Sequence, residues 1–234
     1  GGPATRIALS PDGKLIASCD RKSAAIWNLT GGGSVSIPME TRIVPRPGGS
    51  QNYTSVTDVA FSHDSKTLAV ATGFGGAIRV FDATSGKELR GLESGLFLVS
   101  AVAFDPKGRL VVAVGYGESG HNIVAMDPAS GSIRWRAAYT TPQIKNLDQV
   151  ISVLFSPDGS RLIAGTEWSG NAIMLDTAGG KVLRAFPTEA WSRVAALAFS
   201  PDSRRLAAAG GDVTDANYKV FVWEVDTGKQ VALL

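Results

Sequence analysis

The sequence has little that could serve covalent or metal chemistry. Among its 234 residues there is one cysteine, Cys19, and there are two histidines, His63 and His121. A single cysteine excludes a disulfide within the chain and favours a reducing compartment. We therefore expect a cytoplasmic protein, with the periplasm as the alternative. No cysteine or histidine spacing matches a zinc site and no phosphate-binding loop occurs, so we expect no metal and no cofactor.

A dominant charge and long apolar runs are also missing. The 23 basic and 21 acidic residues leave a formal net charge of +2. This balance offers no broad basic surface, so we expect no nucleic acid and no membrane among the partners. No apolar run reaches the roughly 18 residues of a membrane-spanning helix. The chain opens at Gly1 without a basic and apolar leader, so we expect a fragment of a longer polypeptide.

What the sequence does contain is one short passage, repeated five times. Each copy carries a turn of the type Ser-Pro-Asp-Gly, and the copies recur at a period of roughly 40–50 residues. The turns lie at Ser10–Gly13, Ser62–Ser65, Asp105–Gly108, Ser156–Gly159 and Ser200–Ser203. A second landmark, an apolar or aromatic residue before a polar one, follows each turn, at Ile26–Asn28, Val80–Asp82, Ala125–Asp127, Met174–Asp176 and Val222–Glu224.

Each copy is typical of four short strands. Apolar residues alternate before the turn, as at Val153 and Phe155, and alternation is a strand signal. The turn itself has a mechanism, because proline presets one backbone angle, aspartate bonds its own backbone and glycine accepts positive φ. The next segment consists of apolar and small residues, as expected of a strand buried on both faces. The last segment is more polar, as expected of an outer edge strand.

Four-stranded units at this period indicate a β-propeller. Apolar residues recur every two positions and not every 3.6, so we expect no helix. The prediction is an all-β chain in one domain, residues 1–234, with blades at about 4–40, 56–93, 99–138, 150–187 and 194–234. Five blades are visible, and we favour an arc of a larger seven- or eight-bladed ring over a closed ring of five.

The repeats resemble WD-repeat β-propellers of a degenerate bacterial type. The resemblance rests on the five recurring turns and on the remnants of the Trp-Asp pair, which are Trp27-Asn28, Phe81-Asp82, Met126-Asp127, Leu175-Asp176 and Trp223-Glu224. The Gly-His pair of that family is absent from every copy, so we expect its His–Ser–Asp–Trp hydrogen-bond network to be broken. The Ser-Pro-Asp-Gly turns are also similar to TolB-like propellers, and Met126–Ala137 is similar to quinoprotein blades.

The resemblance implies a non-catalytic scaffold or sensor module that binds a protein or peptide, or other segments of its own full-length chain. It also implies attachment to, or association with, a bacterial effector or signalling domain. The alternatives are a quinoprotein- or hydrolase-like propeller enzyme and a TolB-like component of a periplasmic complex. The residues give catalysis little support, because His121 and Glu118 could exchange a proton but have no nucleophile beside them.

The candidate binding surface is the top rim, where links between blades and between second and third strands emerge. Three aromatic residues follow the second strand in consecutive blades, and aromatic residues and arginine carry most interface energy. A long insertion at Pro38–Ser55 adds an aromatic and two basic residues. The predicted partner-binding residues are Phe74, Tyr116, Trp168, Trp191, Tyr53, Arg42 and Arg46. The alternatives are that the rings cover their own blades and that the insertion is a plain flexible loop.

Overall fold

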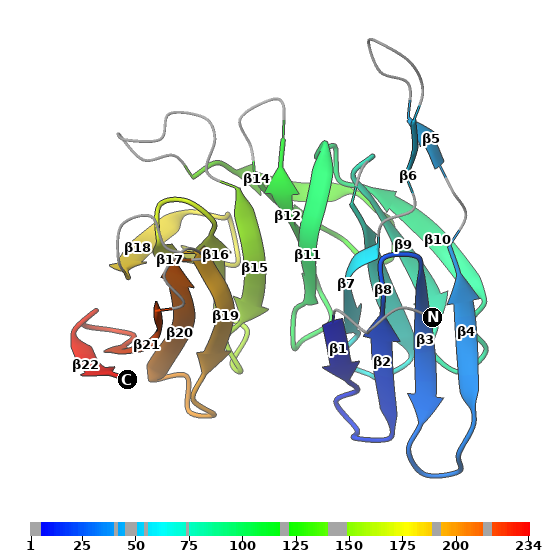
Figure 1. Cartoon of the computed structure of the whole chain (residues 1–234), viewed down its shortest axis with the longest axis horizontal. Coiled ribbons are helices and arrows are strands. Elements are labelled where there is room, and N and C mark those ends of the chain that lie inside the picture. The colour runs from blue at the N-terminus through cyan, green and yellow to red at the C-terminus, as the bar shows by residue number, and fades with distance from the viewer. Residues whose placement is uncertain are drawn as a thin grey trace.

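The structure is a computed structural model that describes residues 6–39, 42–44, 51–53, 56–73, 75–117, 122–139, 149–188, 193–212 and 217–234. Within these ranges there is no helix, and the strands form five four-stranded antiparallel sheets and one two-stranded hairpin (Figure 1). The all-β propeller architecture expected from the repeat is confirmed. No helix that could cross a membrane occurs in the part of the chain that is described.

Each sheet is one blade, built from strands that are consecutive in the sequence. Blade 1 contains β1 (Arg6–Leu9), β2 (Leu15–Cys19), β3 (Ser23–Asn28) and β4 (Ser34–Pro38). Blade 2 contains β7 (Val56–Phe61), β8 (Thr67–Thr72), β9 (Ala77–Asp82) and β10 (Glu88–Glu93). Blade 3 contains β11 (Leu98–Phe104), β12 (Val111–Tyr116), β13 (Ile123–Met126) and β14 (Ile133–Ala137).

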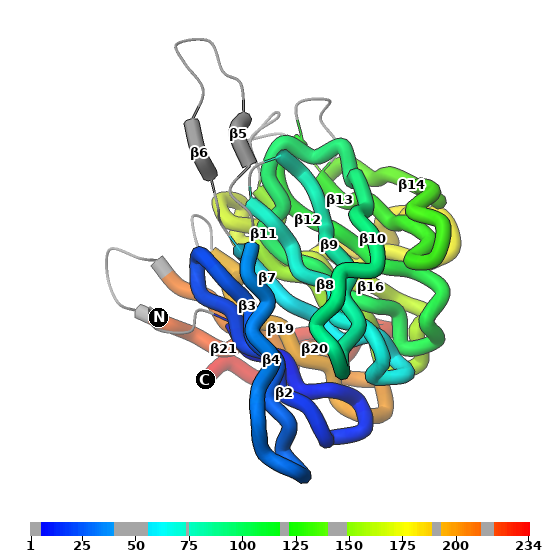
Figure 2. The backbone as a smooth tube through the Cα atoms, turned by 90° about the vertical axis from the view of Figure 1, so that its right-hand side faces the viewer, coloured from blue at the N-terminus to red at the C-terminus, as the bar shows by residue number. Residues whose placement is uncertain are grey.

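Blade 4 contains β15 (Val150–Phe155), β16 (Arg161–Thr166), β17 (Asn171–Asp176) and β18 (Val182–Pro187). Blade 5 contains β19 (Arg193–Phe199), β20 (Arg205–Asp212), β21 (Asn217–Glu224) and β22 (Gln230–Leu233). Between blades 1 and 2, β5 (Arg42–Val44) pairs with β6 (Gln51–Tyr53), and this hairpin stands away from the blades (Figure 1). Blades 2 and 3 lie side by side (Figure 2).

The Ser-Pro-Asp-Gly turn organises the bottom of each blade. In blade 4 the Ser156 hydroxyl donates to the Asp158 carboxylate at 2.6 Å and accepts the backbone N–H of Arg161 at 3.0 Å. Gly159 takes a φ of 69°, a region that favours glycine. The same hydroxyl–carboxylate pair closes the turns of blades 1, 2 and 5. The turns therefore satisfy their own polar groups and are structural.

Blade 3 replaces this serine with a buried aspartate. Asp105 accepts the backbone N–H of Lys107 at 2.9 Å and pairs with the guanidinium of Arg109 at 2.9 Å. A carboxylate can take the place of the hydroxyl because a cation neutralises it.

Neighbouring blades pack through their two faces. We call the face toward the preceding blade the front face and the face toward the following blade the rear face. The front face of blade 4 presents Phe155, Leu162 and Leu175, and these pack against the rear-face residues Val112 and Val114 of blade 3. Phe155 is only 6% exposed, which confirms that it is buried between blades.

A second contact joins the fourth strands of blades 2, 3 and 4 to the turn between the third and fourth strands of the following blade. The Trp135 indole N–H donates to the carbonyl of Thr177 at 3.0 Å. The Arg184 guanidinium donates to the carbonyl of Thr227 at 2.9 Å, and Arg90 donates in the same way to Ala129. We call this contact the clasp. The sequence analysis missed it because the partners lie about a whole repeat apart.

The second strands show where the stack of blades ends. As predicted, β8, β12 and β16 are buried on both faces. The prediction is wrong for β2, which alternates between buried and half-buried residues, and for β20, where Arg205 is exposed and Ala207 and Ala209 are half-buried between buried neighbours. These two strands belong to the end blades, and each end blade has a neighbour on one side alone.

The five blades form an open arc. The described parts of blade 1 pack on blade 2, and those of blade 5 pack on blade 4, but the two end blades do not pack on each other (Figure 1). The first strands lie toward the middle of the arc and the fourth strands toward its outside. Links between second and third strands emerge at the top, opposite the Ser-Pro-Asp-Gly turns.

Candidate binding surface

Trp168 is presented at the top by a link with its own hydrogen bonds. It follows β16, and the Thr166 hydroxyl lies 2.8 Å from the Ser169 hydroxyl and accepts the backbone N–H of Asn171 at 3.0 Å. The carboxylate of Glu167 lies 4.0 Å from the guanidinium of Arg193. The Trp168 side chain is nevertheless 50% exposed. A hydrogen-bonded link thus holds a large aromatic ring in contact with solvent.

Tyr116 occupies the corresponding place in blade 3 with a different environment. Its ring is half-buried and meets the ring of Phe97 edge to face, with centroids 6.3 Å apart and an interplanar angle of 87°. The backbone N–H of Phe97 also donates to the carbonyl of Tyr116 at 2.8 Å. Tyr116 therefore covers the link that enters its own blade, while part of its ring still faces the rim.

The other predicted rim residues cannot be joined to these two. Phe74, Trp191 and Arg46 lie outside the described residues, as do His121 and Glu118 of the weighed proton-transfer pair. Arg42 and Tyr53 belong to the hairpin strands β5 and β6, whose backbone alone is described. The structure thus brings Tyr116 and Trp168 to one rim, and the remaining assignments stay predictions.

The bottom of the arc has a different character. The Ser156 hydroxyl and the backbone N–H of Ser160 lower the pKa of Asp158 to about 2. Serine hydroxyls likewise lower the pKa values of the turn carboxylates in the other blades of this type, Asp12, Asp64 and Asp202. These carboxylates stay ionised at neutral pH because their own turns hold them. They stabilise their own turns, and the bottom face therefore has similar chemistry in each of these blades.

One half-buried carboxylate was missed by the sequence analysis. Asp58, in the first strand of blade 2, accepts the backbone N–H of Val102 in blade 3 at 3.0 Å. Burial raises the pKa of Asp58 to about 6. The Thr57 hydroxyl beside it donates to the carbonyl of Val99 at 2.8 Å. Both side chains bond the first strand of blade 2 to the first strand of blade 3. A single acidic residue in an apolar strand was the sequence signal that could have indicated this contact.

Within the described residues, no group of three or more histidine, cysteine, aspartate or glutamate side chains could hold a metal ion. Cys19 is a buried free thiol.

The family comparison agrees with the repeat. The model of the family described as WD domain, G-beta repeat matches residues 1–28, 48–82 and 180–224. These three segments match WD repeats. The resemblance stated from the sequence is confirmed, and the TolB-like alternative stays untested. WD repeats build rigid propellers, and such repeat scaffolds offer extended surfaces to other proteins.

A curated relative extends the same conclusion. The chain is 28% identical, over 166 residues, to an uncharacterized WD repeat-containing protein of Synechocystis sp. (strain ATCC 27184 / PCC 6803 / Kazusa). The match covers 70% of this chain and 41% of that relative. The chain therefore matches less than half the length of this relative.

The hydrogen-bond network of the WD family survives in part. In blade 1 the Trp27 indole N–H donates to the Ser18 hydroxyl on the adjacent strand at 3.0 Å. Blades 2, 3 and 4 have Phe81, Met126 and Leu175 at the position of Trp27, and none of these side chains has a donor. Packing replaces the network in those blades, as expected from the sequence.

Proposed function

We propose that this WD-repeat chain is a non-catalytic scaffold or sensor module whose protein or peptide partner docks on the top rim. The observation that carries the proposal is the exposure of Trp168 at that rim. Trp135 and Trp223, in contrast, are 8% and 2% exposed and serve the contacts between blades. A tryptophan held in solvent by a hydrogen-bonded link is the kind of anchor that interfaces use.

The difference between the bottom turns and the top links also supports the top rim as the docking surface. The bottom turns repeat one hydrogen-bond pattern, and their carboxylates are engaged by their own turns. The top links differ in length and chemistry between blades, and one of them carries the β5–β6 hairpin (Figure 1). Binding commonly resides in variable loops on a rigid scaffold.

The proposal also covers the cellular compartment, the attached domain and the class of partner. We place the module in the bacterial cytoplasm, attached to or associated with an effector or signalling domain, and we assign it neither nucleic acid nor membrane as a partner. The resemblance to bacterial WD-repeat proteins supports the attachment, and the balanced charge supports the partner class.

Site-specific photo-crosslinking tests the proposal in the natural host. A benzophenone amino acid replaces Trp168 in the encoded polypeptide, and a matched variant carries it at Leu183, which is equally exposed on the outer strand of the same blade. We expect a discrete crosslinked protein from position 168 and none from position 183. With that partner in hand, Trp168→Ala should weaken binding about 30-fold, the loss expected when a central tryptophan is truncated.

Thermal melts accompany the binding measurement. Because Trp168 is half exposed, Trp168→Ala should leave the melting temperature unchanged, so weaker binding cannot be ascribed to unfolding. Equal crosslinking at positions 168 and 183, or binding that is unaffected by Trp168→Ala, would reject the rim as the docking surface.

A further inference from the structure

The front face of blade 1 exposes residues whose equivalents in the other blades are buried or half-buried against the preceding blade. Trp27 is 46% exposed, whereas none of its four equivalents is more than 3% exposed; these are Phe81, Met126, Leu175 and Trp223. Leu9 is likewise 61% exposed, whereas its equivalents Phe61 and Phe155 are buried and its equivalents Phe104 and Phe199 are half-buried. The same repeat position is thus covered wherever a preceding blade is present.

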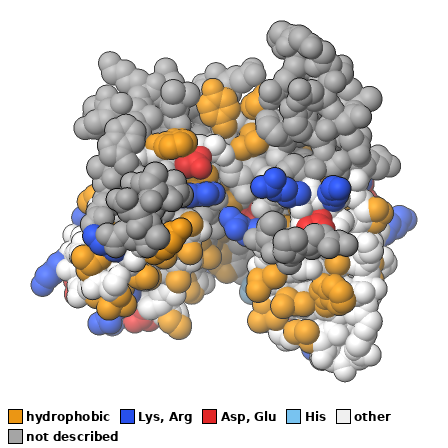
Figure 3. Space-filling view, in the orientation of Figure 1, with side chains coloured by type: hydrophobic (Ala, Val, Ile, Leu, Met, Phe, Trp, Pro, Cys, Tyr) orange, Lys and Arg blue, Asp and Glu red, His pale blue; other side chains and the backbone are white. Residues whose placement is uncertain are grey.

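These exposed residues form one continuous surface. Leu9 lies opposite Ile16 on the adjacent strand, and Ile16 lies opposite Trp27 on the next. Ile7, on the same face, is 70% exposed. In Figure 3 hydrophobic side chains gather over blade 1 at the lower right, and a hollow separates them from blade 5. An apolar patch spread over three strands marks an interaction site.

The rear face of blade 5 is apolar as well. Paired positions on β20 and β21 place Ala207 opposite Val222 and Ala209 opposite Val220. All four side chains are half-buried. Their equivalents in blade 4 include Ile163 and Met174, and blade 5 buries both. The rear face of blade 5 therefore lacks the cover that the same face has in blade 4.

The turn glycine of blade 1 also lacks the covering side chain that its equivalents in other blades have. The turn glycines of blades 2, 4 and 5 each lie under a side chain of the preceding blade: Gly86 under Val35, Gly180 under Trp135 and Gly228 under Arg184. Gly32 is the equivalent residue of blade 1, and its φ of 72° equals that of Gly180. A Cβ at Gly32 would meet nothing within 4 Å among the described residues.

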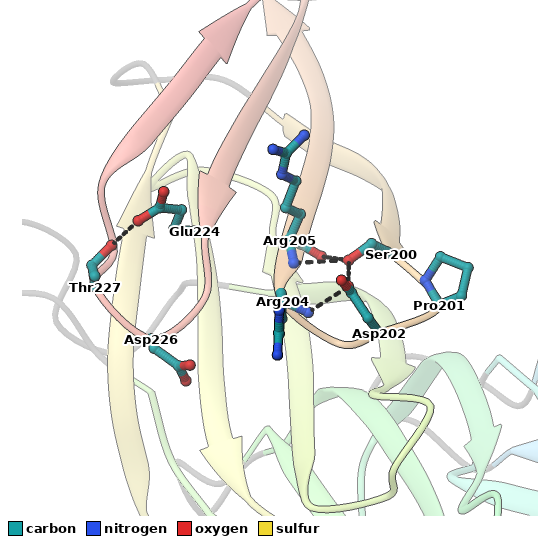
Figure 4. A pocket seen from close by; sticks show the side chains of 8 residues that line it. All are labelled: Ser200, Pro201, Asp202, Arg204, Arg205, Glu224, Asp226 and Thr227. Carbon is teal, nitrogen blue, oxygen red and sulfur yellow. Dashed lines mark hydrogen bonds between the residues drawn. The ribbon is translucent and has the colours of Figure 1, made fainter.

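At the other end of the arc, in blade 5, an arginine has no carboxylate partner from a following blade among the described residues. Arg161 of blade 4 pairs with Asp226, in the turn of blade 5, at 2.6 Å. Arg205 holds the same repeat position in blade 5, and its guanidinium meets no carboxylate among the described residues. It lines a pocket with Asp202, Glu224 and Thr227, all from blade 5 (Figure 4). The corresponding hollows beside blades 2 and 3 are lined by residues of two blades.

We propose that the gap between blades 1 and 5 is filled by further blades of the same repeat type, carried by the same polypeptide beyond residues 1–234. The four blade interfaces in the structure all join consecutive repeats of one chain, and the exposed faces continue that series. The WD-repeat relative has more than half of its length outside the matched region. This inference is independent of the partner proposed for the top rim.

The proposal specifies the chemistry of the missing blades. The blade that precedes blade 1 places a fourth-strand side chain over Gly32, as Trp135 lies over Gly180. The blade that follows blade 5 carries an acidic turn residue for Arg205, as Asp226 serves Arg161. Each new blade presents one apolar face to its neighbour, because the exposed surfaces are apolar.

Thiol labelling of the polypeptide as its gene encodes it tests the proposal. In a Cys19→Ala background, Ile7→Cys reports on the front face of blade 1, and Leu183→Cys reports on an outer strand that stays exposed. We expect a maleimide to label position 7 at least about tenfold more slowly than position 183. In the isolated 234-residue chain, kept dilute, both positions should react alike.

Two results would overturn the proposal. Equal labelling of positions 7 and 183 in the encoded polypeptide would show that no blade covers the front face. Protection of position 7 that rises with protein concentration would show that a second copy of the chain is the occupant.

A pair of glycine variants gives an independent readout. Gly32→Ala and Gly180→Ala impose the same backbone strain, because both residues have a φ of 72°. In the encoded polypeptide we expect both variants to lower the urea midpoint equally, whereas in the 234-residue chain Gly32→Ala should lower it less. A smaller effect of Gly32→Ala in the encoded polypeptide would contradict a clasp over Gly32.

Discussion

Asp58 is a residue at which fold stability and protonation are coupled. Burial raises its pKa from 3.8 to about 6, although the N–H groups of Val102 and Val59 and the charge of Arg6 favour the ionised form. The folded state therefore binds the proton more tightly than the unfolded state does. The stability that this proton contributes is fully present below pH 3.8 and is lost as pH rises through about 6.

We predict that Asp58→Asn removes this pH dependence. The shift corresponds to roughly 3 kcal/mol of unfolding free energy, lost between about pH 4 and pH 6 in the natural chain. Asparagine is neutral and keeps an oxygen to accept the N–H of Val102, so the variant should be flat across that interval and more stable at pH 7. Urea unfolding at a series of pH values measures both effects.

Asp158→Asn serves as the control. The pKa of Asp158 is lowered to about 2, so its contribution is present above pH 3.8 and is lost only as pH falls toward 2. Its variant should differ from the natural chain by a constant amount between pH 4 and pH 6. A slope that persists in Asp58→Asn would assign the pH dependence to another group.

Among the strands, the inner ones carry most of the packing. Phe155 ends the first strand of blade 4 and lies in the core shared with blade 3. The outer strand β18, in contrast, is exposed at most of its positions. Stability therefore depends on where a strand lies in its blade, although the strands of one blade have similar lengths.

We predict that Phe155→Ala lowers the free energy of unfolding by about 3–5 kcal/mol, the usual range for a buried phenylalanine. Leu183→Ala, on the exposed side of β18, should lower it by less than about 1 kcal/mol. Chemical denaturation of the two variants measures the difference. Similar losses from both variants would mean that the space between blades 3 and 4 is not a close-packed core.

For the whole molecule, the open arc predicts association. The isolated 234-residue chain exposes two apolar end faces that are complementary by the logic of the repeat, because a front face always packs on a rear face. We expect this chain to self-associate in light scattering at micromolar concentration. Lysine at both Ile7 and Leu9 should shift it toward the monomer, and Leu183→Lys should not. If the unmodified chain is a monomer at this concentration, the end faces do not associate.

The sequence by itself determined the four-stranded blade and its turns, because these depend on local chemistry. The Ser-Pro-Asp-Gly turns form from bonds that reach only two to five residues along the chain, as between Ser156, Asp158 and Arg161. Alternating apolar residues then specify which side of each strand is buried. Phe155 could be predicted to be buried for this reason, since it repeats at one position of the unit.

Only the tertiary structure decided which blade faces are covered. Trp27-Asn28 and Trp223-Glu224 are similar as sequence, yet Trp27 is exposed and Trp223 is buried because one blade has a neighbour in front of it and the other does not. The clasp between Trp135 and Thr177 and the raised pKa of Asp58 likewise arise between blades. Such properties depend on contacts across a whole repeat, and no local pattern in the chain encodes whether a neighbouring blade is present.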